Sequence, residues 1–175
     1  EHDKKTHSEA LYWRGEAYYA KGQYATAASN FRSAVALGGE NAGKATYGLG
    51  YTYFQRSQTD AAEKEFLRFL KMAKRDEKEL YADACNRIAD CNFFASDYHT
   101  AETYYTKAVE AASSNSDYSL YHKAIAQGLR KDYKAKIATL GSLIGKYPAS
   151  DHIQQGYYEK GRAHIEIEEN DKAIA

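Results

Sequence analysis

Six histidines are the residues of this 175-residue chain best suited to bind a metal, and they lie at positions 2, 7, 99, 122, 152 and 164. A zinc site on a helix needs two histidines on one face, as in the pattern His-Glu-x-x-His. None of the six has that spacing. We therefore interpret them as surface or interface residues and predict no metal site.

Two cysteines, Cys85 and Cys91, are the candidates for redox or nucleophilic chemistry. They are six residues apart on one predicted helix, which separates them by about 9 Å along the axis. A disulfide needs Cα atoms within about 7 Å, and the spacing is not the Cys-x-x-Cys of zinc or redox sites. We expect both to be small, unpaired packing residues.

No nucleotide or hydrolase motif is present. The chain has no Gly-x-x-x-x-Gly-Lys-Ser/Thr and no Gly-x-Ser-x-Gly, and its lone Gly-x-Gly, ending at Gly50, lies inside a predicted helix. A phosphate loop would need a strand before it. We expect no cofactor and no catalytic activity in this chain, although a catalytic domain could lie outside it.

The charge balance argues against nucleic acid as a dedicated partner. Lys plus Arg equals Asp plus Glu, 24 each, so the formal net charge is zero. A dedicated nucleic-acid binder needs an excess of basic residues. No apolar run approaches the roughly 20 residues that span a bilayer. The polar start "EHDKKTHSEA" is not a signal peptide, so an exported form would have lost its targeting segment.

The elements that carry these residues recur along the chain. Five small residues recur at separations of 35, 39, 35 and 37 positions, and they are Gly15, Gly50, Ala89, Ala124 and Gly161. The residues that stand nine positions after them are, in the same order, Tyr24, Thr59, Tyr98, Tyr133 and Asn170. Self-similarity at this period marks an array of supersecondary units.

Each copy reads as two helices, here called helix A and helix B. Apolar residues flank Gly15 at helical spacing, Gly22 interrupts the pattern, and a second apolar stripe follows until Gly38. We expect the small residue of helix A to allow close approach of helix B. Ala27 and Ala62 are the predicted small counterparts on helix B.

The order of small, aromatic and alanine residues resembles the tetratricopeptide repeat. The residues that carry the resemblance are Gly15, Tyr18, Tyr24, Ala27, Phe31 and Ala34 in the first copy, Leu49, Gly50, Tyr53, Ala62 and Phe66 in the second, and Ile88, Ala89, Tyr98, Ala101, Tyr105 and Ala108 in the third. The resemblance implies an all-α fold, a right-handed α-solenoid of about five helix-turn-helix repeats. The expected repeats span residues 8–42, 43–81, 82–116, 117–153 and 154–175 within one domain, 1–175.

Two copies depart from the pattern. Lys136 occupies the place of the helix B alanine in the fourth copy, where a long cation is expected not to pack closely and so to leave that helix pair more open or rotated. The fifth copy stops at Ala175, shortly after its helix B should begin near Asn170. We expect a fragment of a longer array, or an array in which helix A of the last copy serves as the cap. The incomplete last repeat is also a candidate surface for self-association.

In the family, the residues three before, one after and four after the small residue of helix A face a concave groove. The resemblance therefore implies a partner-binding groove made by Tyr12, Glu16, Tyr19, Tyr47, Tyr51, Phe54, Asp90, Phe93, Tyr121, Tyr158 and Arg162. Tyrosine, which occurs 17 times in the chain, offers a large rigid contact area together with a hydroxyl group. The alternative is that these rings only pack the helices together.

The resulting hypothesis is a non-enzymatic scaffold that binds a peptide or protein partner. One subgroup of the family clamps a terminal carboxylate with Lys and Asn, but here Tyr12 and Glu16 stand at those places. The segment around "YADACNRIADCNFF" is similar to repeats of bacterial envelope proteins, which favours the periplasm or cell envelope over the cytoplasm. A glycan or cell-wall-binding surface and a regulatory or sensor domain of a larger enzyme remain the alternatives.

Overall fold

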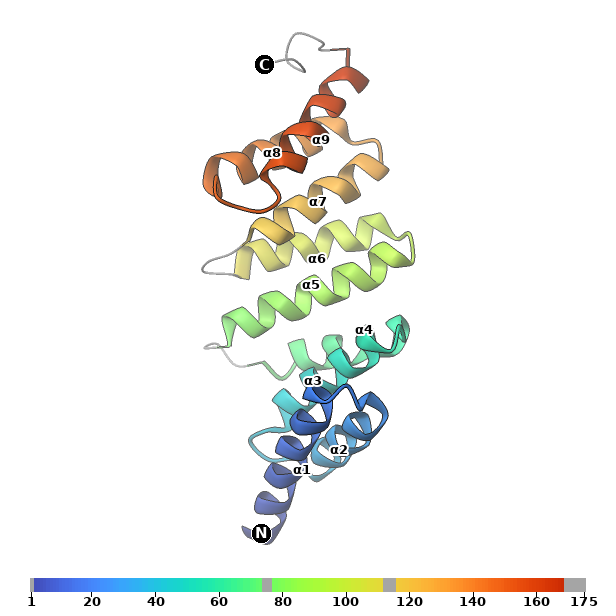
Figure 1. Cartoon of the computed structure of the whole chain (residues 1–175), viewed down its shortest axis with the longest axis vertical. Helices are drawn as coiled ribbons and strands as arrows, with labels where there is room; N and C mark the ends of the chain where they lie inside the picture. Colours follow the sequence, from blue (N-terminus) through green and yellow to red (C-terminus); the bar gives the residue numbers. More distant parts are fainter. Residues whose placement is uncertain (1, 74–76, 112–115, 169–175) are drawn as a thin grey trace. The chain divides into compact units, whose positions relative to one another are not determined.

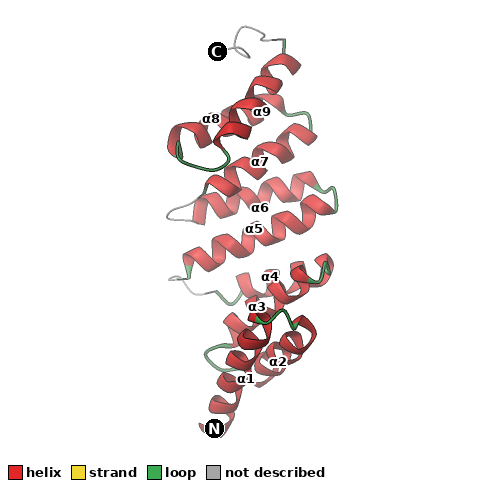
Figure 2. Cartoon of the chain, in the orientation of Figure 1, coloured by secondary structure: helices red, strands yellow, loops and turns green. Residues whose placement is uncertain are grey.

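The structure, a computed structural model, describes residues 2–73, 77–111 and 116–168, and all regular structure in these ranges is α-helical (Figures 1 and 2). The predicted all-α class is confirmed. The helices are α1 (His2–Ala20), α2 (Tyr24–Leu37), α3 (Ala42–Gln55), α4 (Thr59–Leu70), α5 (Lys78–Phe94), α6 (Tyr98–Ala111), α7 (Asp117–Leu129), α8 (Tyr133–Lys146) and α9 (Ile153–Glu166).

The chain divides into two compact units, unit 1 (Glu1–Glu77) and unit 2 (Lys78–Ala175). Unit 1 contains α1 to α4 and unit 2 contains α5 to α9. In each unit, helices that follow one another in sequence pack side by side, as in stacked helix pairs. The division falls in the connection after α4, where the spacing between copies is widest.

The turn between helix A and helix B has the same backbone conformation in every copy. Seven residues after each small residue, φ is positive: 71° at Gly22, 56° at Ser57, 62° at Ser96, 61° at Lys131 and 63° at Glu168. L-residues adopt this left-handed region only as isolated residues. Glu168 therefore marks the turn of the fifth copy, whose predicted helix B lies outside the described residues.

Aspartates begin two of the B helices. Asp97 precedes α6 and its Oδ1 accepts from the backbone N–H of Thr100 at 3.1 Å. Asp132 does the same for the N–H of Ala135 at 3.1 Å, at the start of α8. Each carboxylate satisfies a donor that the first turn of a helix leaves without an intrahelical partner.

The core of unit 1 is built on glycines that face phenylalanine rings. A Cβ atom added to Gly15 on α1 would stand 2.7 Å from the ring of Phe31, and one added to Gly48 on α3 would stand 2.8 Å from the same ring. Gly50 has the same relation to Phe66 on α4. The close approach of helices A and B was predicted correctly, but rings, not the two predicted alanines, lie nearest to the glycines.

In unit 2, Lys136 is packed between α7 and α9 and is only 6 % exposed. Its stem lies against Gly128 on α7, whose missing side chain leaves room for it, and its ammonium forms an ion pair with Glu159 on α9. The expectation that a long cation cannot pack closely here was wrong, because this glycine and this carboxylate accommodate it.

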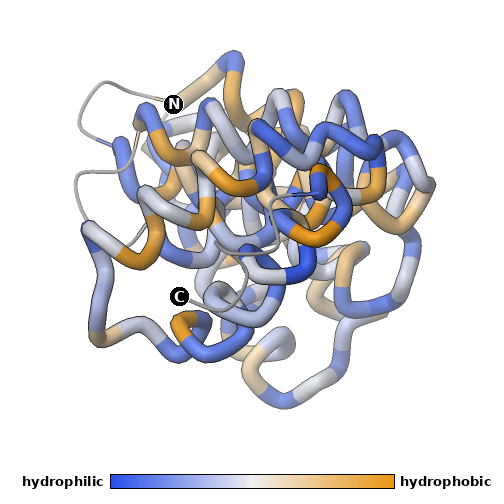
Figure 3. The backbone as a smooth tube through the Cα atoms, turned by 90° about the horizontal axis from the view of Figure 1, so that it is seen from above, coloured by the Kyte–Doolittle hydropathy of each residue, from blue (hydrophilic) through white to orange (hydrophobic). Residues whose placement is uncertain are grey.

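Apolar and polar stretches alternate along the helices of both units (Figure 3). Such alternation is typical of helices that pack on one side and face solvent on the other. Within the described ranges, no helix combines the length and the apolar character that crossing a membrane requires.

Candidate partner-binding site

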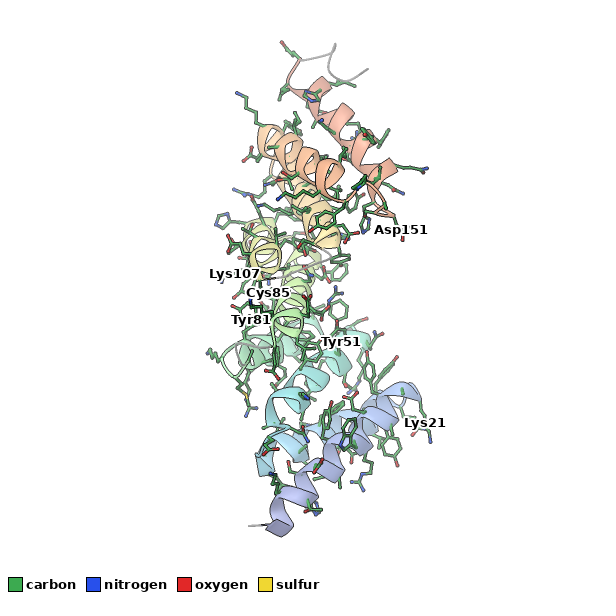
Figure 4. The ribbon with its side chains drawn as sticks, turned by 90° about the vertical axis from the view of Figure 1, so that its left-hand side faces the viewer. Lys21, Tyr51, Tyr81, Cys85, Lys107 and Asp151 are labelled. Carbon is green, nitrogen blue, oxygen red and sulfur yellow. The ribbon has the colours of Figure 1, made fainter. Side chains whose placement is uncertain are left out.

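A hollow of about 260 Å³ opens on unit 1 between α1 and α3. Its lining consists of Glu16 and Tyr19 from α1 and of Tyr47, Gly48 and Tyr51 from α3. Four of these five residues are among those predicted to face the groove. Tyr51 is labelled on α3 in Figure 4.

The tyrosines of the hollow are held by other rings. Tyr51 meets Phe66 edge to face with ring centroids 5.3 Å apart, and Tyr47 packs on Phe69 at 5.1 Å. Tyr47 and Tyr51 also contact one another at 5.1 Å. All the rings of the hollow are half-buried. Packing on one side therefore fixes rings that line the hollow on the other.

Glu16 brings a carboxylate into this aromatic surrounding. Its side chain is half-buried, and burial raises the pKa of its carboxyl group above the ordinary 4.5. The neighbouring cation on α1, Arg14, donates instead to the amide oxygen of Asn30. Within the described part of the chain, Glu16 has no ion-pair partner.

Two predicted groove residues of unit 1 lie elsewhere. Tyr12 is only 9 % exposed and packs in the core beside Phe31, at a centroid distance of 6.2 Å. Burial, followed by the nearby charge of Glu16, raises its pKa. Phe54 is half-buried near the end of α3 and is not a lining residue of the hollow.

In unit 2, the predicted groove residue Asp90 is a buried acceptor, 5 % exposed. Its Oδ1 accepts from the hydroxyl groups of Tyr105 on α6 and Tyr118 on α7, at 2.6 and 2.9 Å, and its Oδ2 lies 2.7 Å from Arg87. Burial, then the charge of Asp90, raises the pKa of both tyrosines. This carboxylate joins three helices and is not on the surface.

Histidines extend this buried cluster. His122 packs against Tyr118 at 4.2 Å, and burial lowers its pKa, which the charge of Asp90 counteracts. The predicted groove residue Tyr121 stacks on His152 with centroids 4.6 Å apart and planes at 5°. These rings pack α7 against the segment before α9.

The other predicted groove residues of unit 2 occupy different environments. Phe93 meets Tyr98 edge to face at 5.3 Å. Tyr158 is 65 % exposed, and the guanidinium carbon of Arg162 lies 5.8 Å from its ring centroid. Arg162 also reaches Glu159 at 3.4 Å. Phe93 and Tyr158 are therefore in surroundings that differ from those of Tyr19, Tyr47 and Tyr51 in unit 1.

Unit 2 has its own hollow of about 260 Å³, lined by Ile125, Gly128, Leu129, Tyr133, Lys136, Glu159, Arg162, Ala163 and Glu166. Its charges are mixed and largely paired with one another. Of its lining residues, only Arg162 belongs to the predicted set. Ile125 and Gly128 stand one and four residues after the small residue Ala124, at the register that faces the groove in the family, and Lys136 departs from the repeat pattern.

Other kinds of site find little support in the described residues. No group of three or more His, Cys, Asp or Glu side chains there is arranged to hold a metal ion. Cys85 and Cys91 are both buried thiols that form no disulfide with each other, in agreement with their predicted role as packing residues.

Comparison with family models identifies the repeats directly. Models described as tetratricopeptide repeat match residues 8–41, 47–116 and 118–150, which together make up most of the chain. A search of curated protein sequences finds no match.

Solved structures with the same fold include MamA, YrrB and RapI. A MamA crystal structure is 17 % identical, has a TM-score of 0.80, and is aligned over 95 % of this chain and 86 % of its own. YrrB, described as a tetratricopeptide protein with an unusual peptide-binding site, is 15 % identical with a TM-score of 0.76 over 94 % and 79 %. The apo form of RapI is 13 % identical with a TM-score of 0.79 over 94 % and 50 %. At these identities the likeness concerns the fold.

Proposed function

The chain belongs to the tetratricopeptide repeat family, and from this premise we propose that unit 1 binds an extended or helical peptide segment of a partner protein in the hollow between α1 and α3. Repeats of this family serve as protein-interaction scaffolds. The finer assignment depends on one observation: residues from successive A helices, predicted to face a groove, line a common hollow.

The character of the lining suits capture of a side chain. Tyr47 and Tyr51 present rings that are already held by Phe66 and Phe69. Binding of a partner would therefore cost little side-chain entropy in this chain, because these rings are already fixed. Such preorganised aromatic anchors typically contribute most of the binding energy of an interface. The peptide-binding site named for YrrB supports a peptide ligand by analogy of fold only.

The test is selection of binders from a displayed library of random dodecapeptides against the chain. Tyr51→Leu keeps an apolar side chain against Phe66 but removes the ring from the hollow, so selected peptides should bind it at least about tenfold more weakly, the loss of one interface anchor. Circular dichroism should show unchanged helical content.

The matched control is Tyr98→Leu. Tyr98 is also half-buried and also meets a phenylalanine, Phe93, with centroids 5.3 Å apart, but it lies on α6 in unit 2. Selected peptides should bind this variant like the original chain. Peptides that bind Tyr51→Leu with full affinity would show that the hollow is not the binding site. A soluble polysaccharide that competes with them would favour the glycan alternative.

A further inference from the structure

We propose that the hollow of unit 1 is a cation pocket, which receives the ammonium or guanidinium group of a lysine or arginine side chain of the partner. This inference rests on the proposed function and adds the chemistry of the group that is bound. It follows from the combination of Glu16 with the rings of Tyr19, Tyr47 and Tyr51 around one opening.

The electrostatics of the opening favour a positive charge. Glu16 is the charged residue among the five described lining residues, and no cation of the described ranges is paired with it. A half-buried carboxylate is poorly hydrated, which is why its pKa is raised. A cation placed beside it would replace the lost hydration with a direct charge interaction, which is stronger at a partly desolvated site than in water.

The rings act in the same direction. The face of a tyrosine ring carries partial negative charge and attracts a cation within about 6 Å of its centroid. Tyr47 and Tyr51 come from α3 and Tyr19 comes from α1, so rings approach the opening from both helices. A guanidinium or ammonium group in the hollow would meet rings on both sides and the carboxylate of Glu16.

The size of the hollow fits a single side chain. At about 260 Å³ it lies below the range of roughly 300–1,000 Å³ that is typical of pockets for drug-sized ligands. The hollow of unit 2 has the same volume but different electrostatics, because Lys136 and Arg162 both contact Glu159 there. Of these two hollows, that of unit 1 is therefore the one expected to prefer cations.

The test compares a cation with its neutral isostere. The chain is titrated with Nα-acetyl-arginine amide and with Nα-acetyl-citrulline amide, which differ by the charge of the terminal group, and the ring resonances of Tyr19, Tyr47 and Tyr51 are followed by NMR. The arginine compound should bind roughly fivefold more tightly, because the charge interaction with Glu16 adds to the cation–π contacts of the rings. Nα-acetyl-lysine amide, titrated in parallel, shows which of the two cations is preferred.

Glu16→Gln keeps the shape of the side chain and removes its charge. The preference for arginine over citrulline should fall below about twofold in this variant, because only the rings then distinguish the compounds. The matched control is Glu9→Gln, an exposed glutamate on the same helix, which should keep the original preference. The two variants should have similar melting temperatures.

Equal binding of the two compounds, no binding of either, or a preference that survives Glu16→Gln would overturn the cation pocket. The peptide library separates this failure from failure of the proposed function. The selected peptides could bind Tyr51→Leu more weakly and yet bind equally well without any lysine or arginine. This result would support peptide binding in the hollow and refute only the cation pocket.

Discussion

Phe66 on α4 lies against the backbone of Gly50 on α3 so closely that a Cβ atom at position 50 would stand 2.9 Å from the ring. The ring is fully buried. We therefore expect Gly50→Leu to lower the free energy of unfolding by about 1–3 kcal/mol through overpacking. Thermal or urea unfolding followed by circular dichroism measures this change.

The control for Gly50→Leu is Gly141→Leu in the middle of α8, where no neighbouring atom lies within 4 Å of an added Cβ. Leucine favours helix over glycine by up to about 1 kcal/mol, so this variant should be as stable as the original chain or more stable. Equal melting temperatures for Gly50→Leu and the original chain would contradict the packing described for α3 and α4.

A second prediction concerns Asp90. The variant Asp90→Asn keeps a hydrogen-bond acceptor but leaves the charge of Arg87, whose side chain is 17 % exposed, without its closest partner. We expect a loss of about 2–4 kcal/mol in the stability of unit 2, because the largely buried charge of Arg87 is then compensated less well, although its 3.8 Å contact with Asp83 remains. Asp151→Asn, at an exposed position, is the control and should leave the melting temperature unchanged.

Acid should destabilise unit 2 through His122. Burial lowers its pKa below the ordinary 6.5, although Asp90 opposes the shift, while His152 and Arg87 add to it. The unfolded chain therefore binds a proton at a higher pH than the folded chain, and stability falls as the pH drops through 6.5 toward the lower folded pKa. Below the folded pKa this contribution no longer changes.

His122→Gln isolates this contribution. The difference in melting temperature between pH 7.5 and 5.5, values chosen to lie about one unit on either side of the ordinary histidine pKa, should be smaller in this variant than in the original chain. Substitution of the exposed His7 by glutamine should leave the difference unchanged. A pH dependence that is the same in all three proteins would contradict the prediction.

The cysteines should be inert in the folded chain. Cys85 is fully buried, and burial raises its pKa from 9.0 to about 12, with a smaller opposing effect of Lys107. At pH 8 only about one thiol in ten thousand would then be ionised, and the thiolate is the reactive form. Cys91 is 2 % exposed. Ellman's reagent should react with neither thiol in the native chain and with both in guanidinium chloride. In the variant Cys91→Ala, rapid reaction of the native chain with the reagent would contradict the burial of Cys85.

The sequence predicted the features of the fold that repeat. The spacing of the small residues placed every A-to-B turn within the described ranges, because a packing contact that recurs in each copy leaves a periodic trace. The sequence predicted the backbone conformation of those turns less well. Gly22 signals positive φ, but Ser57, Ser96 and Lys131 adopt it without a glycine.

Contacts between copies were harder to predict. Asp90 stands at a position expected to face the groove, but the tyrosines that bury it come from α6 and α7, and nothing near it in sequence identifies them. Lys136 likewise depends on Gly128 and Glu159 from two other helices. Within unit 1, the register of the family predicted Glu16, Tyr19, Tyr47 and Tyr51 together, because they lie on A helices that succeed each other in the stack.

The ring of Phe31, which fills space beside Gly15 and Gly48, constrains how such an array can be rebuilt. The two glycines belong to successive copies. A recombination event with a breakpoint between α2 and α3 would therefore separate Phe31 from Gly48. A graft that carries α2 together with α3 keeps Phe31 and Gly48 as a linked pair. That graft separates Phe31 from Gly15, so only α1, α2 and α3 exchanged together keep both contacts.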